Sequence, residues 1–283
     1  MEGYLIMNQG SFKFLLIILS LFLGSSVLCA EPVRIMPLGD SITYENTVRD
    51  LENPRPEGVR AAYRGYLWYN LQDSGYEADF VGSEIAGQDI TPPFDPDNEG
   101  HPGWTSYELS EFTYDFLSEN PADIVLLHIG TNDHGTSTAG VEQILDSIDL
   151  YEKDTGKSVQ VFVAMIIDRK KHDRLIELFN ENLKSVIGRR IKNGDHLTLV
   201  DMYHGAGLTS GDYIDPIHPN YRGFQKMAAV WTNALLSPYT SGLYAFPYTL
   251  IDQDYIDTES IVVDSGAQTV EFVTVVPDNG IIF

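Results

Sequence analysis

The sequence predicts an α/β protein, folded as a three-layer α/β/α sandwich around a five-stranded parallel sheet of the flavodoxin type. Apolar runs and helical patterns alternate along the first 238 residues, as in chains that build a parallel sheet. Residues 124–129 form a nearly continuous apolar run, which is typical of a central strand buried on both faces. In such sheets ligands bind beyond the carboxyl ends of the strands, so short polar blocks after the runs are candidate sites.

Five strands are predicted from short apolar runs that turn residues bound. The first runs directly into a Gly-Asp-Ser turn, and the second follows Gly75. The predicted strands cover residues 33–37, 79–82, 124–129, 159–165 and 197–202.

Five helices are predicted between and after these strands, because their apolar residues recur at helical spacing. In the first of them, Tyr63, Tyr66, Leu67 and Leu71 line one face, and Gly75 ends the pattern. The predicted helices cover residues 63–74, 107–118, 140–151, 174–191 and 221–236.

Residues 83–103 are polar and rich in Pro, Gly and Asp, so we expect a long surface loop. A loop of this length within a compact domain is usually functional. Asp95, Asp97 and Glu99 alternate as in a Ca²⁺ loop, but the remaining ligands of such a loop are missing. We therefore expect solvated loop acids here.

Residues 1–30 are predicted to be a signal peptide, so the protein is expected to be secreted. Lys13 precedes the apolar run 14–23, which is too short to span a bilayer comfortably, and cleavage after Ala30 fits this layout. Cys29 is the only cysteine, and a lipoprotein anchor there is the less favoured alternative because bulky Leu28 precedes it. If Cys29 leaves with the signal, the mature chain has no thiol for a disulfide.

Residues 31–238 are predicted to form the catalytic domain, and residues 239–283 a separate β-rich appendage. The runs 260–263 and 269–273 are rich in β-branched residues and lack helical periodicity. This segment is either a small appendage or the first strands of a truncated module.

The charge balance is strongly acidic. Lys and Arg number 18 against 41 Asp and Glu, for a formal net charge of -23. This excess argues against binding to nucleic acid phosphates or to an anionic membrane surface. We expect neutral or cationic substrates, no nucleic acid or membrane partner, and a monomer.

Four short blocks carry the residues of a serine esterase. They are residues 39–43 (GDSIT), 100–104 (GHPGW), 130–133 (GTND) and 215–219 (DPIHP). All but the second follow a predicted strand, and the second lies in the long loop. Together they supply a serine, possible oxyanion donors and an Asp/His pair.

Asp215 and His218 are three residues apart between two prolines. This spacing lets the carboxylate accept from imidazole Nδ1–H, so that Nε2 can take a proton from a serine. A purely structural turn, or a pair of metal ligands near Asp212 and His204, is the alternative. No known ligand spacing appears, so we predict no metal.

Ser41 can present its hydroxyl at the strand end, and a helix N-cap is the alternative role for it. The Asn132 side chain and the Gly103 N–H can converge on a tetrahedral oxyanion, with turn formation as the alternative. Asp40 and Asp133 are expected to pin turns, and Arg64 to bind carbonyl groups or an ion-pair partner. His101 and His128 are expected to pack. Tyr44, Trp104 and Tyr107 form either a sugar-stacking edge or ordinary packing.

These residues resemble the SGNH (GDSL-type) hydrolases, and residues 34–43, 63–64, 79–83 and 99–104 resemble the acetyl xylan esterases of carbohydrate esterase family 3. The resemblance covers roughly residues 33–236. It implies the α/β/α fold and metal-independent ester hydrolysis without a cofactor. It also implies Ser41 as nucleophile, His218 as base, Asp215 as its orienting partner, and Ser41 N–H, Gly103 N–H and the Asn132 side chain as the oxyanion hole. Tyr44-Glu45 stand where many members have a glycine, which reshapes the lip of the pocket.

The expected function is that of a secreted serine esterase that removes acetyl groups from a plant-type polysaccharide such as acetylated xylan. Two alternatives stay open. One is a lipid- or thioester-directed hydrolase of the same fold, and the other is a non-catalytic carbohydrate-binding module.

Overall fold

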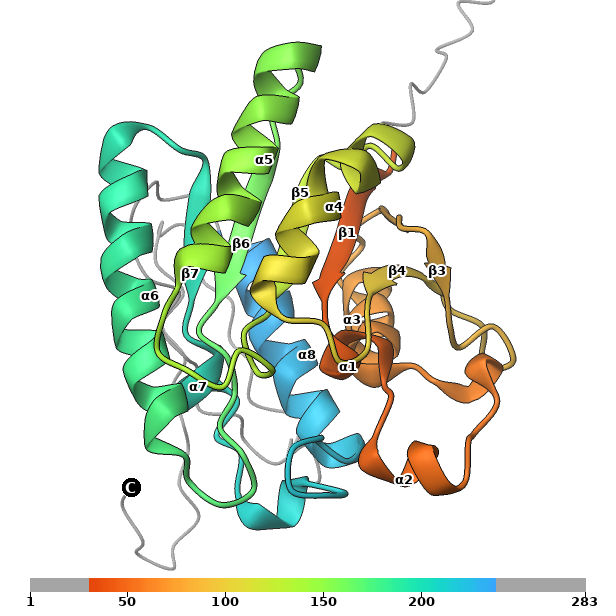
Figure 1. The fold of residues 1–283 in the computed structure, drawn as a ribbon. Helices are drawn as coiled ribbons and strands as arrows, with labels where there is room; N and C mark the ends of the chain where they lie inside the picture. Colours follow the sequence, from red (N-terminus) through yellow and green to blue (C-terminus); the bar gives the residue numbers. More distant parts are fainter. Residues whose placement is uncertain (1–30, 238–283) are drawn as a thin grey trace, which may run out of the picture. The chain divides into compact units, whose positions relative to one another are not determined.

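A computed structural model describes residues 31–237 and confirms the three-layer α/β/α sandwich within them (Figure 1). Five parallel strands run in the order β2-β1-β5-β6-β7, which is the flavodoxin-like order for five sequential strands. Their bounds are β1 (Val33–Gly39), β2 (Ala78–Phe80), β5 (Ile124–His128), β6 (Gln160–Ala164) and β7 (Leu197–Val200).

Two strands arise from the segment that was expected to be a plain surface loop, and that expectation is wrong for them. They are β3 (Glu84–Ile85) and β4 (Asp97–Gly100), which pair antiparallel with each other. β4 extends the sheet beside the carboxyl end of β1, opposite Leu38 and Gly39. The sequence did not predict β4, because its side chains are polar. Most of them are buried nevertheless, since hydrogen bonds within the protein replace those to water.

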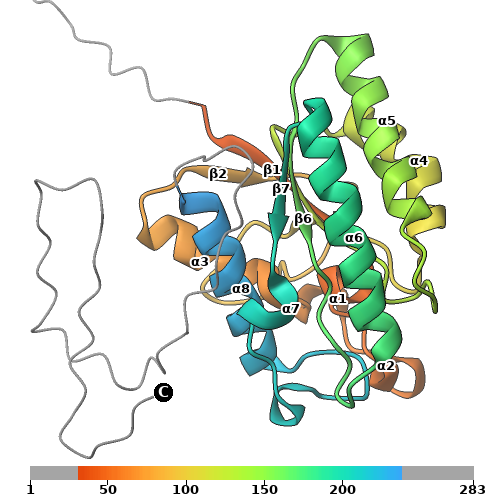
Figure 2. The ribbon, with the colours of Figure 1, turned by 90° about the vertical axis from the view of Figure 1, so that its left-hand side faces the viewer.

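The helices cover the two faces of the sheet (Figure 2). Helices α4 (Ser106–Glu119), α5 (Ala139–Thr155) and α6 (Arg174–Asn193) pack on one face, and α3 (Ala62–Asp73) and α8 (Tyr221–Leu236) pack on the other. Side chains alternate along β1, so that Met36 and Leu38 join the first core and Ile35 joins the second. All five helices were predicted, each within about one helical turn at its ends.

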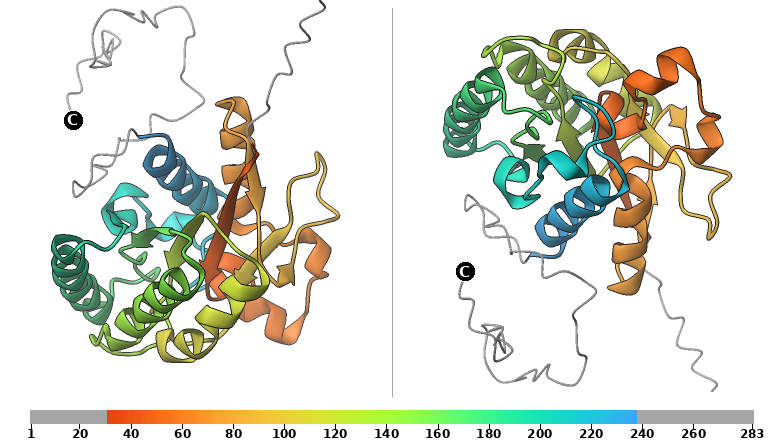
Figure 3. Two further views of the ribbon diagram at one scale, coloured as in Figure 1. Left: turned by 90° about the horizontal axis from the view of Figure 1, so that it is seen from above. Right: turned by 90° about the horizontal axis from the view of Figure 1, so that it is seen from below.

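Short elements gather where the parallel strands end. These are α1 (Ser41–Tyr44), α2 (Val48–Glu52), η1 (Glu57–Val59), α7 (Met202–Gly205) and η2 (Ser210–Asp212). Figure 1 shows α1, α2 and α7 at the end toward which the strands point, and Figure 3 shows the same elements from below. The carboxyl edge of the sheet is therefore built from several separate loops, as ligand sites in this architecture are.

Among residues 31–237, no helix combines the length and apolar character that a membrane span requires. The predicted signal peptide and the predicted β-rich appendage both lie outside the described residues.

Candidate active site

Ser41 is the first residue of α1, immediately after β1. Its predecessor Asp40 is the N-cap, and Asp40 Oδ1 accepts a hydrogen bond from the Ile42 N–H at 2.9 Å. The alternative that Ser41 itself caps the helix is therefore wrong. Because Asp40 does the capping, the Ser41 hydroxyl is available for another partner.

Gly39 lets α1 start close to the neighbouring strand. A Cβ at this position would lie 2.4 Å from the His128 carbonyl oxygen and 2.5 Å from Thr43 Oγ1. No side chain fits at such distances, so the glycine permits the sharp passage from β1 into the helix that carries Ser41.

Ser41, His218 and Asp215 form one hydrogen-bonded chain. Ser41 Oγ lies 2.9 Å from His218 Nε2, and His218 Nδ1 lies 2.9 Å from Asp215 Oδ2. A carboxylate can only accept, so Nδ1 carries the proton and Nε2 accepts from the serine hydroxyl. All three residues are buried, with 6–8% of their surface exposed, so little water competes for these bonds.

Three backbone N–H groups hold the Asp215 carboxylate. Oδ1 accepts from Ile217 and His218, both at 2.8 Å, and Oδ2 accepts from Val48 at 2.9 Å. Burial by itself raises the pKa of Asp215, but these N–H donors outweigh it and the pKa lies below its ordinary value. Asp215 therefore stays ionised and oriented toward the imidazole.

Asp212 and His204, the residues of the metal alternative, form no hydrogen bond with Ser41, His218 or Asp215 and have other partners. Asp212 is bound by Thr209 and by Lys226 Nζ at 2.9 Å, and His204 pairs with Asp201. Across the described range 31–237, no group of three or more His, Cys, Asp or Glu residues is arranged to hold a metal ion.

The three predicted oxyanion donors lie at the carboxyl edge, Ser41 at the start of α1 and Gly103 and Asn132 in turns. Within the described part of the chain, the N–H groups of Ser41 and Gly103 have no acceptor. Asn132 Nδ2 donates to the Trp104 carbonyl at 2.9 Å, which orients the amide and leaves its second proton unused. Gly103 has a φ of +86°, a left-handed conformation that glycine adopts without strain.

Glu99 and His101 support the loop that carries Gly103. Glu99 is fully buried rather than solvated, which corrects the sequence expectation. It accepts from Ser83 N–H and Oγ–H, and its Oε1 lies 2.6 Å from His101 Nε2. The His101 ring stacks on Trp104 at 4.2 Å between centroids and on Phe116 at 4.8 Å, so His101 packs as expected.

Arg64 confirms its expected carbonyl-binding role. The fully buried guanidinium donates to the carbonyl oxygens of Thr43, Arg60, Ala86 and Pro96. Arg64 thus ties α1 and the β3–β4 region to α3. Loss of its five N–H donors would leave these buried carbonyl oxygens unpaired.

The remaining predicted residues are structural in position. Asp133 accepts from the Ser106 N–H and hydroxyl and so holds the start of α4. His128 is fully buried, and burial lowers its pKa to about 4, so it is neutral. Of the proposed sugar-stacking residues, Tyr44 is buried, whereas Tyr107 is 43% exposed.

Sequence reasoning missed Val48, whose N–H reaches Asp215 across 167 residues of sequence. The available signal was the spacing of Thr47 and Asp50, which form a capping box at the start of α2. That spacing predicts a helix start but says nothing of what the helix N-terminus faces.

Comparison with known proteins identifies relatives in sequence and in fold. The model of the GDSL-like Lipase/Acylhydrolase family matches residues 38–226. A multidomain esterase of Ruminococcus flavefaciens is 28% identical over 272 residues, which is 82% of this chain, and the chain spans about a third (33%) of that protein's length.

Solved structures with the same fold include two family 3 carbohydrate esterases. The one from Talaromyces cellulolyticus has a TM-score of 0.60 and 26% identity, and the match covers 72% of this chain and 96% of that chain. The one from Clostridium thermocellum has a TM-score of 0.59 and 26% identity, with coverage of 71% and 94%. A mutant acetyl esterase with an acetate ion is similar to the same degree, at TM-score 0.60 and 26% identity over 72% of this chain and 96% of that chain.

Proposed function

The chain belongs to the GDSL-like lipase/acylhydrolase family, and we propose that this carboxylic ester hydrolase removes O-acetyl groups from a plant-type polysaccharide such as acetylated xylan. The observation that carries the proposal is the buried chain Ser41–His218–Asp215, with 2.9 Å at each of its two links. A serine hydroxyl bonded to an oriented imidazole is the arrangement that acyl transfer through a covalent intermediate requires.

In the proposed reaction, His218 Nε2 takes the proton as Ser41 Oγ attacks the acetyl carbonyl carbon. The resulting oxyanion is bound by the N–H groups of Ser41 and Gly103 and by the Asn132 amide. Collapse of this intermediate expels the sugar hydroxyl, to which His218 returns the proton, and leaves acetyl-Ser41. Water then attacks the acetyl carbonyl carbon as His218 takes its proton. The bond from this carbon to Ser41 Oγ breaks, His218 returns the proton to Oγ, and acetate leaves. Asp215 stabilises the imidazolium in both halves.

The acetyl-carbohydrate specificity is supported by the structural relatives. Two of them are family 3 carbohydrate esterases, and a third is an acetyl esterase with acetate bound. Each shares 26% identity with this chain. Residues 34–43 and 99–104, which resemble this family, contain Ser41 and Gly103, two of the three proposed oxyanion donors.

The test is acetate release by wild type and Ser41→Ala from acetylated xylan, acetylated pectin and a small acetate ester. We expect release by the wild type on xylan and on the small ester, and none above background by the variant. Undiminished release by purified Ser41→Ala would refute the assignment.

The rival acyl specificity is tested separately, with acetyl and octanoyl esters of one alcohol. We expect higher kcat/KM for acetyl, and a strong octanoyl preference would favour a lipid-directed hydrolase instead. A non-catalytic binding module predicts no turnover at all, together with glycan binding by residues 239–283.

We propose in addition that the protein is exported, on the strength of the signal-like pattern in residues 1–30. Expression of the full chain in a secreting host should yield a culture-medium form whose first residue is Glu31. Retention of the intact N-terminus in the cytoplasm would contradict export.

A further inference from the structure

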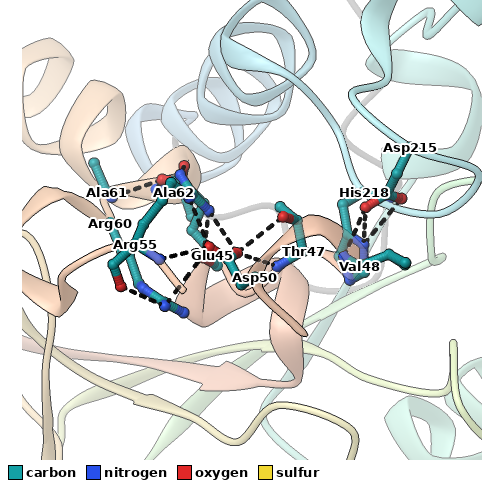
Figure 4. Close-up of polar contacts among 10 residues, drawn as sticks. All are labelled: Glu45, Thr47, Val48, Asp50, Arg55, Arg60, Ala61, Ala62, Asp215 and His218. Carbon is teal, nitrogen blue, oxygen red and sulfur yellow. Dashed lines mark hydrogen bonds and ion pairs between the residues drawn. The ribbon is translucent and has the colours of Figure 1, made fainter. Parts of the chain in front are cut away.

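Arg55 joins two carboxylates in the segment between α1 and α3 (Figure 4). Its Nη1 lies 2.7 Å from Glu45 Oε1, and its Nε and Nη2 lie 2.9 Å from the two oxygens of Asp50. We call Glu45, Asp50 and Arg55 the Arg55 network. The bidentate contact to Asp50 uses the planar fork of the guanidinium, which holds geometry more strictly than a single ion pair.

Glu45 anchors the network to the two helices at its ends. It is the C-cap of α1, with a φ of +71°, and its Oε2 accepts from the N–H groups of Ala61 and Ala62 at 2.7 and 2.6 Å. The start of α3 and the end of α1 are thereby tied to one carboxylate. These bonds close residues 45–62 into a loop, and Arg55 in the middle of this loop binds both Glu45 and Asp50.

Asp50 anchors the network to the turn before α2. Its Oδ2 accepts from the Thr47 N–H at 2.7 Å and from the Thr47 hydroxyl at 2.8 Å. Burial by itself raises the pKa of Asp50, but the bonds from Arg55 and Thr47 hold it well below its ordinary value. The ionised Asp50 carboxylate thus fixes the position of Thr47. The next residue is Val48, so the position of the Val48 N–H depends on that of Thr47.

We propose that the Arg55 network is a positioning element of the catalytic triad, which aims the Val48 N–H at Asp215 Oδ2. The inference rests on the proposed function. No side chain of the network forms a hydrogen bond to Ser41 or His218, and the only direct link is the Glu45 N–H, which donates to the Ser41 carbonyl at 2.8 Å as the C-cap of α1. The proposed action on the triad passes instead through the backbone hydrogen bond of 2.9 Å from Val48 to Asp215. Val48 is 43% exposed, so the proposal concerns its N–H and not the packing of its side chain.

Proline at position 48 removes this N–H with little cost to the fold. Val48 is the first residue of α2, a position where proline is favoured because the helix itself uses no N–H there. Thr47 has φ −105° and ψ 165°, an extended conformation that suits a residue before proline. Val48→Ala is the matched control, since it shortens the side chain and keeps the donor.

We expect Val48→Pro to lower kcat about tenfold relative to Val48→Ala, far less than the ~10⁴-fold loss typical when the triad carboxylate is replaced. KM for a small acetate ester and the thermal midpoint should match those of Val48→Ala. The low-field proton NMR signal of His218 Nδ1–H should move in Val48→Pro only. Equal kcat and an unmoved signal would overturn the proposal.

Arg55→Met tests the network through the same bond. We expect it to lower kcat, and the double variant Arg55→Met/Val48→Pro to be no slower than Val48→Pro alone, because both remove one interaction. Multiplied losses would show that Arg55 does not act through Val48. Arg189→Met is the matched control, because Arg189 forms an exposed ion pair with Glu142 on the α5–α6 side and should leave kcat unchanged.

The outcomes separate this inference from the proposed function. Lack of Ser41-dependent acetate release would refute the function, while the His218 signal in the purified variants still decides the inference. If Val48→Pro does not fold, Arg55→Met decides alone: its His218 signal must move and that of Arg189→Met must not.

Discussion

Asp40 lies beside Ser41, the proposed nucleophile, and one of its carboxylate oxygens is buried without a partner among residues 31–237. The residue is fully buried, and the oxygen without a hydrogen-bond partner is Oδ2. Thr131 Oγ1 is also buried and unpartnered. Burial is the largest effect on this carboxyl and raises its pKa to about 7, because the one hydrogen bond that it accepts, from the Ile42 N–H, does not offset the loss of solvation.

Asp40→Asn should therefore change stability in a pH-dependent way. A folded pKa above the ordinary 3.8 means that the folded state binds the proton more tightly, so wild-type stability falls as pH rises from about 4 to 7. The variant has no such loss. At about 1.4 kcal/mol per pKa unit, its gain over wild type between pH 4 and pH 8 is at most about 4 kcal/mol. Urea unfolding at both pH values measures it, and a pH-independent difference would contradict it.

Asn132 should contribute to the transition state and little to substrate binding. Removing one oxyanion donor typically costs about 10²–10³-fold in rate, so Asn132→Ala should lower kcat by that factor with KM nearly unchanged. Steady-state kinetics on a small acetate ester checks this. Asn70→Ala is the control, because its amide bonds Thr232 between α3 and α8. A kcat loss below about threefold at Asn132 would remove it from the oxyanion hole.

At the scale of elements, the crossing of α4 and α5 depends on one small residue. A Cβ at Gly140 would lie 2.1 Å from Ser106 Oγ and 2.7 Å from the Tyr107 backbone nitrogen. Ser106 cannot easily give way, because its hydroxyl and its N–H are both bound to Asp133.

Gly140→Ala should destabilise the protein by about 1–3 kcal/mol, the usual cost of overpacking. Gly188→Ala is the matched substitution, since Gly188 lies within α6 with open space where its Cβ would be. There alanine should stabilise by up to about 1 kcal/mol through helix propensity. Chemical denaturation of both variants measures the contrast, and equal shifts in one direction would refute it.

The sequence pattern predicted the elements with strong periodicity and missed the shorter ones without it, among them β3 and β4. The five principal strands and five helices follow apolar spacing, which the burial of each face enforces. β4 carries Asn98 and Glu99 into the interior, where local hydrogen bonds satisfy them. β4 is parallel to β1 and ends at Gly100. The block at residues 100–104 therefore begins at a strand end, like the first and third blocks, and not within an unstructured loop as expected.

At the scale of the whole molecule, the formal net charge of -23 sets long-range behaviour toward charged substrates. The net charge exerts no long-range force on neutral acetylated xylo-oligosaccharides. Acetylated pectin carries carboxylates, which a negatively charged protein repels.

We expect kcat/KM on acetylated pectin to rise as salt increases from about 0.01 M to about 0.1 M, which shortens the Debye length from about 30 Å to about 10 Å. On neutral xylo-oligosaccharides it should stay constant. Acetate release at several salt concentrations measures both. A salt-independent ratio of the two substrates would show that the net charge plays no part in substrate choice.

The sequence by itself determined the four blocks, their order, and the pairing of Asp215 with His218, because a three-residue spacing brings those side chains together locally. Only the tertiary structure decided which groups complete the site. Ser41 meets His218 across 177 residues, and the Val48 N–H meets Asp215 across 167. Every residue but proline has a backbone N–H, so residue type does not reveal which N–H binds Asp215. In the proposal, the Val48 N–H supports the triad because of its position, which the packing of the chain and the Arg55 network set.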